Sequence, residues 1–191
     1  MNRRAFLSRV ASAFRDLPDI RVVISTGEER LSQALQPVPP NVEVHNFLPQ
    51  LKVLEIADLA ITMGGAGTLR ECIAKQIPLL VYANNHDQMG NSARVVYHGI
   101  GLRGSRRSDS ENTIRKKALQ ILENRSAYTC NLRLMKKRVD HFESDLLSNA
   151  LERAMGPAKA VRQLPKDVVH TAAPRETSAV CPEKSREVFS R

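Results

Sequence analysis

Short apolar runs alternate with amphipathic stretches along most of the chain, and this alternation predicts its secondary structure. Each run is rich in Val, Ile, Leu or Ala and ends at a polar or glycine-containing turn, which is typical of a strand buried on both faces of a parallel sheet. The predicted strands are Arg21–Ser25, Val42–Asn46, Leu59–Met63, Leu79–Tyr82 and Gly99–Arg103.

Helical periodicity occupies the intervals between these runs and continues after the last one. The predicted helices are Arg4–Arg15, Glu28–Leu35, Lys52–Ile56, a helix entered at Leu69, Met89–Tyr97, Glu111–Glu123 and Ser126–Met155. The alternation indicates an α/β fold, with a doubly wound parallel sheet, right-handed crossovers and carboxyl-terminal helices. We expect one Rossmann-like domain over residues 1–155. Residues 156–191 carry prolines and scattered charge, and are predicted to form a disordered basic tail.

The turn after the third predicted strand is rich in glycine. Glycine lets a backbone turn sharply and approach a ligand closely, and the N–H groups at a helix start have no intrahelical partner and lie at the positive end of the helix dipole. Such a strand–turn–helix unit suits a phosphate group, although a turn that merely requires glycine would show the same letters. The residues of this segment are Met63, Gly64, Gly65, Ala66, Gly67 and Thr68.

Polar side chains follow on the same helix and after the next strand. Glu71 lies one helical turn beyond Thr68, so its carboxylate can reach a sugar beside bound phosphates, or it is only a favourable charge in the first turn. Asp87 and Gln88 follow the fourth strand, where parallel strands gather ligands, and their donors and acceptors suit vicinal hydroxyls. Asp87 could equally cap the next helix.

Together with the sequence FLPQ at Phe47–Gln50, these motifs resemble the donor-binding half of UDP-glycosyltransferase family 1, whose members combine two Rossmann-like domains in the GT-B fold. The resemblance runs from about Ala5 to Leu151 and is densest from Val42 to Arg103. It implies that residues 1–155 bind a nucleotide sugar.

The resemblance also implies a role for each motif. Phe47 would pack on the uracil, and Gln50 would lie near the base and the ribose. The glycine-rich turn with Thr68 would hold the diphosphate, and Glu71 would bind the ribose hydroxyls. The pair at positions 87 and 88 would bind the transferred hexose, and the glutamine of this pair favours glucose.

Three residues depart from the family's pattern. Met63 stands where the family usually has a histidine that contacts the diphosphate, and a thioether offers neither charge nor a good hydrogen bond, which predicts weakened donor binding. Phe47 replaces the commoner tryptophan but can still stack. Ala66 replaces a larger residue and would leave part of the pocket empty.

The resemblance further predicts a truncated domain. In the family an apolar strand precedes the first helix, whereas only Met1–Arg3 precede it here, so this strand and the acceptor domain that supplies the catalytic base would be missing. We therefore predict no catalytic residue in this chain. None of its histidines matches the family's base; they are His45, His86, His98, His141 and His170.

Composition agrees with a globular α/β domain, because 42% of the 191 residues are hydrophobic and only 4% are aromatic. The amino-terminal residues lack the apolar segment of a secretion signal, and the three cysteines are far apart, which predicts a cytoplasmic protein. Metal-binding patterns are absent from the sequence, so we expect no metal and no cofactor beyond a UDP-sugar as donor substrate.

Positive charge is concentrated in one stretch. The formal net charge is +9, and residues 103–138 hold eleven Lys and Arg against three acidic residues. Tyr128 is the only aromatic residue there and no RNA-binding motif accompanies it, so we expect no specific nucleic acid partner. Two interpretations stay open, namely a solvated helix face or a surface that approaches an anionic membrane peripherally.

From this resemblance we predict the donor domain of an enzyme that transfers a hexose from a UDP-sugar to a hydroxyl acceptor, with an acceptor-binding domain or subunit as its partner. The alternatives are a donor-binding subunit of a two-chain transferase, an inactive gene fragment, and an enzyme similar to the UDP-GlcNAc 2-epimerases, which share the double-Rossmann architecture. The FLPQ sequence and the Asp87–Gln88 pair favour a transferase over an epimerase.

Overall fold

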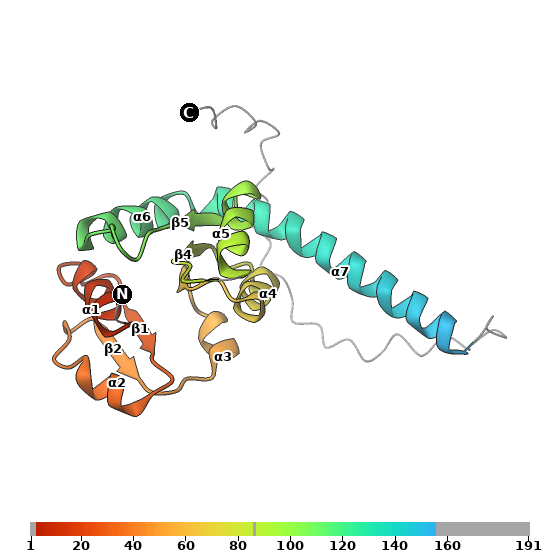
Figure 1. Cartoon of the computed structure of the whole chain (residues 1–191). Helices are drawn as coiled ribbons and strands as arrows, with labels where there is room; N and C mark the ends of the chain where they lie inside the picture. Colours follow the sequence, from red (N-terminus) through yellow and green to blue (C-terminus); the bar gives the residue numbers. More distant parts are fainter. Residues whose placement is uncertain (1–2, 86, 156–191) are drawn as a thin grey trace. The chain divides into compact units, whose positions relative to one another are not determined.

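The computed structural model describes residues 3–85 and 87–155 of the chain (Figure 1). The chain divides into two compact units, Met1–Lys136 and Lys137–Arg191, and the first unit contains all the strands described below. The predicted disordered tail lies outside the described residues. The predicted domain boundary at residue 155 stays a prediction.

Five parallel strands form two small sheets in the first unit. The first sheet pairs β1 (Val22–Ser25) with β2 (Val42–His45), in the register Val22 opposite Val42. The second sheet has the order β3-β4-β5, formed by Ala60–Thr62, Leu79–Val81 and Gly101–Arg103. Each strand lies within a predicted one, so the predicted α/β class with parallel strands is confirmed.

The division into two sheets differs from the single sheet that the sequence predicts. Within the described residues, β1 pairs only with β2, and β3 pairs only with β4. One edge of each of these two strands therefore has no neighbouring strand among the described residues. Their side chains are correspondingly less buried than those of a central strand. Val23 in β1 is 38% exposed and β3 is only half-buried, whereas β4, which has neighbours on both sides, is fully buried.

Seven helices connect and flank these strands in the described part of the chain. They are α1 (Arg3–Ala13), α2 (Glu29–Ala34), α3 (Gln50–Leu54), α4 (Ala66–Lys75), α5 (Asp87–Tyr97), α6 (Glu111–Glu123) and α7 (Arg125–Met155). The predicted bounds of α6 are confirmed. The start of α3 lies two residues earlier than predicted, and α4 begins inside the glycine-rich segment rather than at Leu69.

Helices cover both faces of the three-stranded sheet, as a doubly wound fold requires. On one face, Leu80 and Tyr82 pack in a cluster with Phe6 of α1 and Ile114 of α6. On the other face, Leu79 and Val81 pack with apolar residues of α3, α4, α5 and α7. Alternate side chains of β4 thus point into opposite cores, which fixes the strand's register. The carboxyl ends of β3, β4 and β5 lie along one edge of the sheet.

Candidate donor-binding site

Gly64 makes the sharp turn that ends β3. Its φ of +84° is rare for residues with a side chain, and a Cβ there would lie 2.7 Å from Val81 Cγ1. The Gly64 N–H donates to Thr62 Oγ1 at 3.2 Å. Glycine at position 64 is therefore explained by the turn itself.

The two following glycines are not explained by the turn. A Cβ on Gly65 or on Gly67 would meet no heavy atom within 4 Å, so open space lies beside both. Gly65 is the N-cap of α4 and has ordinary backbone angles, with no side chain to cap the helix. The first N–H groups of α4 consequently have no intrahelical acceptor and face an open surface, which is the arrangement that binds an anion.

A second group of polar side chains joins α3 to α4, which lie side by side (Figure 1). Gln50, the first residue of α3, donates from Nε2 to Thr68 Oγ1 at 3.3 Å and to Glu71 Oε2. The structure thus brings together three residues that the sequence assigns to the ribose and the phosphates. Glu71 is half-buried, and its Oε2 accepts the bond from Gln50.

A third group surrounds the start of α5, which begins at Asp87. Asp87 therefore lies inside the first helical turn and not at the N-cap. Its Oδ2 accepts from Asn91 Nδ2 at 3.2 Å, and the same amide nitrogen donates to Gly64 O at 3.0 Å. Gln88 Oε1 accepts from the Asn84 N–H at 2.9 Å. Asn91 thereby ties Asp87 to the glycine-rich turn, whereas Gln88 is bonded to the loop after β4.

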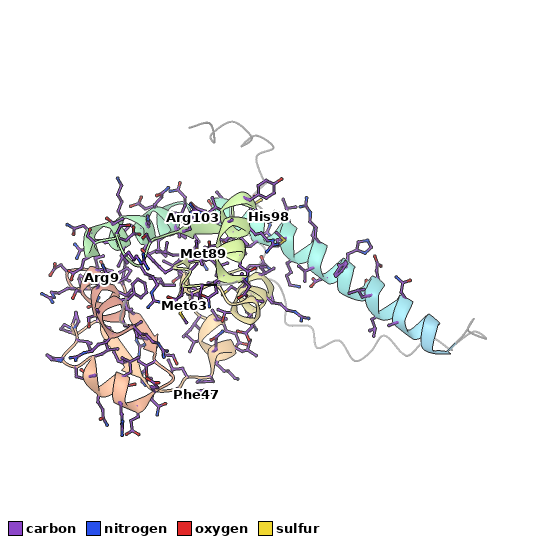
Figure 2. The ribbon with its side chains drawn as sticks, in the orientation of Figure 1. Arg9, Phe47, Met63, Met89, His98 and Arg103 are labelled. Atoms are coloured by element: carbon purple, nitrogen blue, oxygen red, sulfur yellow. The ribbon has the colours of Figure 1, made fainter. Side chains whose placement is uncertain are left out.

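The positions of Phe47 and Met63 are shown in Figure 2. Phe47 lies on the loop after β2, is 78% exposed and is apart from Met63, so its ring is open to stack on a planar group. Met63 is 42% exposed at the end of β3, and Ala66 is exposed at the start of α4. The predicted stacking role of Phe47 stays a prediction.

Three residues of this region were not singled out from the sequence. Asn84 and Asn91 hold Gln88 and Asp87, and Arg106 donates from Nη1 to Asn84 Oδ1 at 3.0 Å. The Asn84–Asn85 pair in the loop between β4 and α5 is a local signal that could have pointed to Asn84. Arg106 is one of eleven cations in its stretch of sequence, and nothing around it marks it as buried.

The described histidines do not suggest a catalytic base at the turn. His45 Nε2 lies 3.3 Å from Glu43 Oε2, His98 packs against the ring of Tyr97, and His141 lies 3.5 Å from Asp145. Of these three, none hydrogen-bonds to the glycine-rich segment. His86 and His170 lie outside the described residues.

One cysteine lies on α4, the helix that follows the glycine-rich turn. Cys72 is a free, fully buried thiol, and burial together with the nearby Glu71 raises its pKa to about 12. In the described part of the chain, no group of three His, Cys, Asp or Glu could hold a metal ion. No helix described by the structure is long and apolar enough to cross a membrane.

Comparison with known families decides the assignment. Residues 16–152 match the family "Erythromycin biosynthesis protein CIII-like, C-terminal domain", a carboxyl-terminal domain of the glycosyltransferases of family 1. The chain belongs to this family. The resemblance seen in the sequence motifs is thereby confirmed, and the chain is a glycosyltransferase carboxyl-terminal, donor-binding domain with a GT-B-type fold.

Individual relatives agree with the family. The chain is 31% identical over 119 residues to the oleandomycin glycosyltransferase of Streptomyces antibioticus, covering 62% of this chain and 28% of that enzyme. It is 41% identical over 76 residues to the zeaxanthin glucosyltransferase of Pantoea ananas, covering 40% of this chain and 18% of that enzyme.

Among solved structures, the glycotransferase of kitacinnamycin superposes with a TM-score of 0.70 at 30% identity, over 78% of this chain and 40% of that one. The chain therefore spans between about a fifth and two fifths of the length of these relatives.

Proposed function

We propose that this chain binds the UDP-sugar donor of a hexosyltransferase and acts with an acceptor-binding domain or subunit. The observation that carries the proposal is the open glycine-rich turn of α4, flanked by the Gln50–Thr68–Glu71 group on one side and by Asp87 and Gln88 on the other. The helix start would take the diphosphate, the Glu71 carboxylate the ribose, and the Asp87–Gln88 pair the hexose.

The chemistry that this arrangement supports is displacement of a nucleoside diphosphate. An acceptor hydroxyl would attack the anomeric carbon of the sugar, a base supplied from outside this chain would take its proton, and UDP would leave. The amides of the turn would stabilise the negative charge that grows on the departing diphosphate. Neither a metal ion nor a further cofactor is needed for this role, and the chain alone would not turn over substrate.

Relatives support parts of this proposal. The family consists of glycosyltransferase domains, which favours a transferase over an epimerase, and the zeaxanthin enzyme is named a glucosyltransferase, which agrees with glucose as the sugar. A donor-binding subunit of a two-chain transferase would use the same site. A chain without a partner, as in an inactive gene fragment, would bind UDP without transferring sugar.

The net charge of the basic stretch overstates its support for a membrane-peripheral role, because several of its cations contact other parts of the protein. Arg106 is buried, Lys117 Nζ pairs with Asp109 at 2.6 Å, Arg125 lies 3.2 Å from Asp58, and Arg115 lies 3.6 Å from Asp16. These four cations serve contacts within the protein. The remaining cations fit a solvated surface, which we take as the better interpretation.

Calorimetric titration of the 191-residue chain with UDP tests the proposal. Replacing Glu71 by alanine removes the acceptor for the ribose hydroxyls and should weaken UDP binding by about 1.5 to 3 kcal/mol. Glu123→Ala serves as the matched control, because Glu123 is exposed at the end of α6. Equal UDP affinities of the two variants would refute the assignment of Glu71.

A further inference from the structure

Arg106 is a buried cation at the same edge of the sheet as the glycine-rich turn. It lies in the loop between β5 and α6 and is only 9% exposed. Its guanidinium lies over the ring of Phe6, 5.0 Å from the centroid, and Nη1 lies 3.9 Å from Met63 Sδ. Since Met63 directly precedes the turn, Arg106 brings a positive charge to the place where the strand end itself offers none.

Among the residues that the structure describes, one edge of this guanidinium has no hydrogen-bond acceptor. The guanidinium of Arg106 contacts Asn84 and Met63 through Nη1. Nε is buried and has no hydrogen-bond partner. Nε and Nη2 form the edge with which arginine binds two oxygens of one oxyanion. A buried donor without an acceptor is costly, so a ligand oxygen here would satisfy a group that the protein leaves unsatisfied.

The charges around Arg106 favour an anion as this ligand. Burial lowers the pKa of Arg106, and the nearby Arg3 and Arg9 lower it further. The carboxylate of Asp109 accepts from Lys117 at 2.6 Å and from Tyr82 at 3.1 Å, and in the described part of the chain no ion pair joins a carboxylate to Arg106.

Arg106 is also held firmly in place. Arg9 Nη2 donates to the backbone oxygen of Arg106 at 2.5 Å, and Arg9 Nη1 donates to the oxygen of Asp109 at 3.0 Å, so α1 fixes both ends of the short loop segment. The side chain is clamped between the Phe6 ring and the Asn84 amide. A preorganised cation pays little ordering entropy when a ligand binds.

We propose that Arg106 binds the diphosphate of the donor through its Nε–Nη2 edge and supplies the cationic contact that Met63 cannot make. The inference rests on the proposed function for the identity of the ligand. Asn84 links the two parts of the site, because its side chain accepts from Arg106 while its N–H donates to Gln88. Phosphate recognition by Arg106 and sugar recognition by Gln88 are thereby joined through one residue.

The test is a comparison of UDP, uridine and inorganic pyrophosphate as titrants of the full chain. Arg106→Met keeps an apolar stem on Phe6 and removes the cation, and Arg107→Met is the matched control, because Arg107 is the exposed neighbour. We expect Arg106→Met to weaken UDP binding by about tenfold or more and the control by less than about twofold. Uridine, which has no phosphate, should bind both variants as it binds the wild type.

Stability separates this role from a merely structural one. Because the unliganded protein buries Arg106 without a carboxylate, Arg106→Met should melt at or above the temperature of the wild type without ligand, while its gain in melting temperature on adding UDP should shrink. If Arg106→Met does not fold, Arg106→Lys replaces it, since lysine keeps the charge but has no bidentate edge. A folded variant of either kind that binds UDP as tightly as the wild type would overturn the inference.

The proposed function and this inference can fail separately. If substitutions of Arg106 leave UDP binding unchanged, the proposed function stands and the inference about Arg106 fails. A wild-type chain that binds pyrophosphate through Arg106 but neither UDP nor uridine would support the anion site and remove the function. A wild-type chain that binds none of the three would overturn both.

Discussion

Met63 places a thioether at the end of β3, where the chain enters the turn of α4. The neighbouring Arg106 lies near enough for its Nη1 to contact the sulfur, and its guanidinium also bonds Asn84. At the scale of single residues, the site therefore carries its positive charge on the loop after β5 and not on the strand end. The effect of a substitution at position 63 on UDP binding should therefore depend on the residue at position 106.

Met63→His is the prediction that follows at this scale. An imidazole at position 63 would add a hydrogen-bond donor beside the diphosphate, so UDP binding should strengthen by about 1 kcal/mol. Titration at pH 6 to 7 measures the gain, with Leu134→His on the exposed face of α7 as the control. A loss, or no change, would mean that position 63 does not adjoin the diphosphate or that the pocket has been repacked.

Local sequence predicts some of these residues and not others. Gln50, Thr68 and Glu71 were predicted from motifs that a short segment displays, and the structure places them in contact. Arg106 could not be predicted, because its burial depends on Phe6 of α1, a hundred residues earlier in the chain. The roles of all the predicted site residues toward a ligand, Gln50, Thr68 and Glu71 included, stay predictions.

At the scale of elements, the start of α4 is the part of the proposed site on which the binding of a phosphate would depend. The helix begins at Ala66, earlier than its apolar periodicity predicts. The spacing of apolar residues indicates which face of a helix is buried, but it does not indicate at which residue the first turn begins. Gln50 is likewise the first residue of α3, directly after the N-cap Pro49, and its side chain reaches α4. By contrast, α6 has an explicit N-cap in Ser110, and its bounds were predicted correctly.

The glycines of this turn should respond differently to alanine. Gly67→Ala adds a methyl group where no protein atom lies within 4 Å, so the melting temperature should equal or exceed that of the wild type while UDP binding weakens. Gly64→Ala is the comparison, because its φ of +84° and the 2.7 Å approach to Val81 Cγ1 should cost about 1 to 3 kcal/mol of stability. Thermal melting and UDP titration of both variants measure these effects. A Gly67→Ala chain that binds UDP normally would show that the ligand does not approach the turn.

At the scale of the whole molecule, the chain is a donor-binding domain whose strands form two sheets. Strand positions were predicted well, because buried strands display continuous apolar runs in the sequence. Pairing between strands was predicted less well, because it depends on which edges meet and no local pattern records that. An open edge on β1 agrees with the predicted loss of the family's first strand, whereas the open edge of β3 among the described strands was found only in the structure.

The most direct measurement of the central claim is an amide spectrum of the ¹⁵N-labelled chain titrated with UDP. If the turn of α4 binds the diphosphate, the largest and saturable shifts should fall on the backbone N–H groups of Gly65, Ala66, Gly67 and Thr68, followed by the side-chain amide of Gln50, while the outer surface of α6 stays unchanged. No saturable shift in the turn, or a binding site that leaves these amides untouched, would contradict the account.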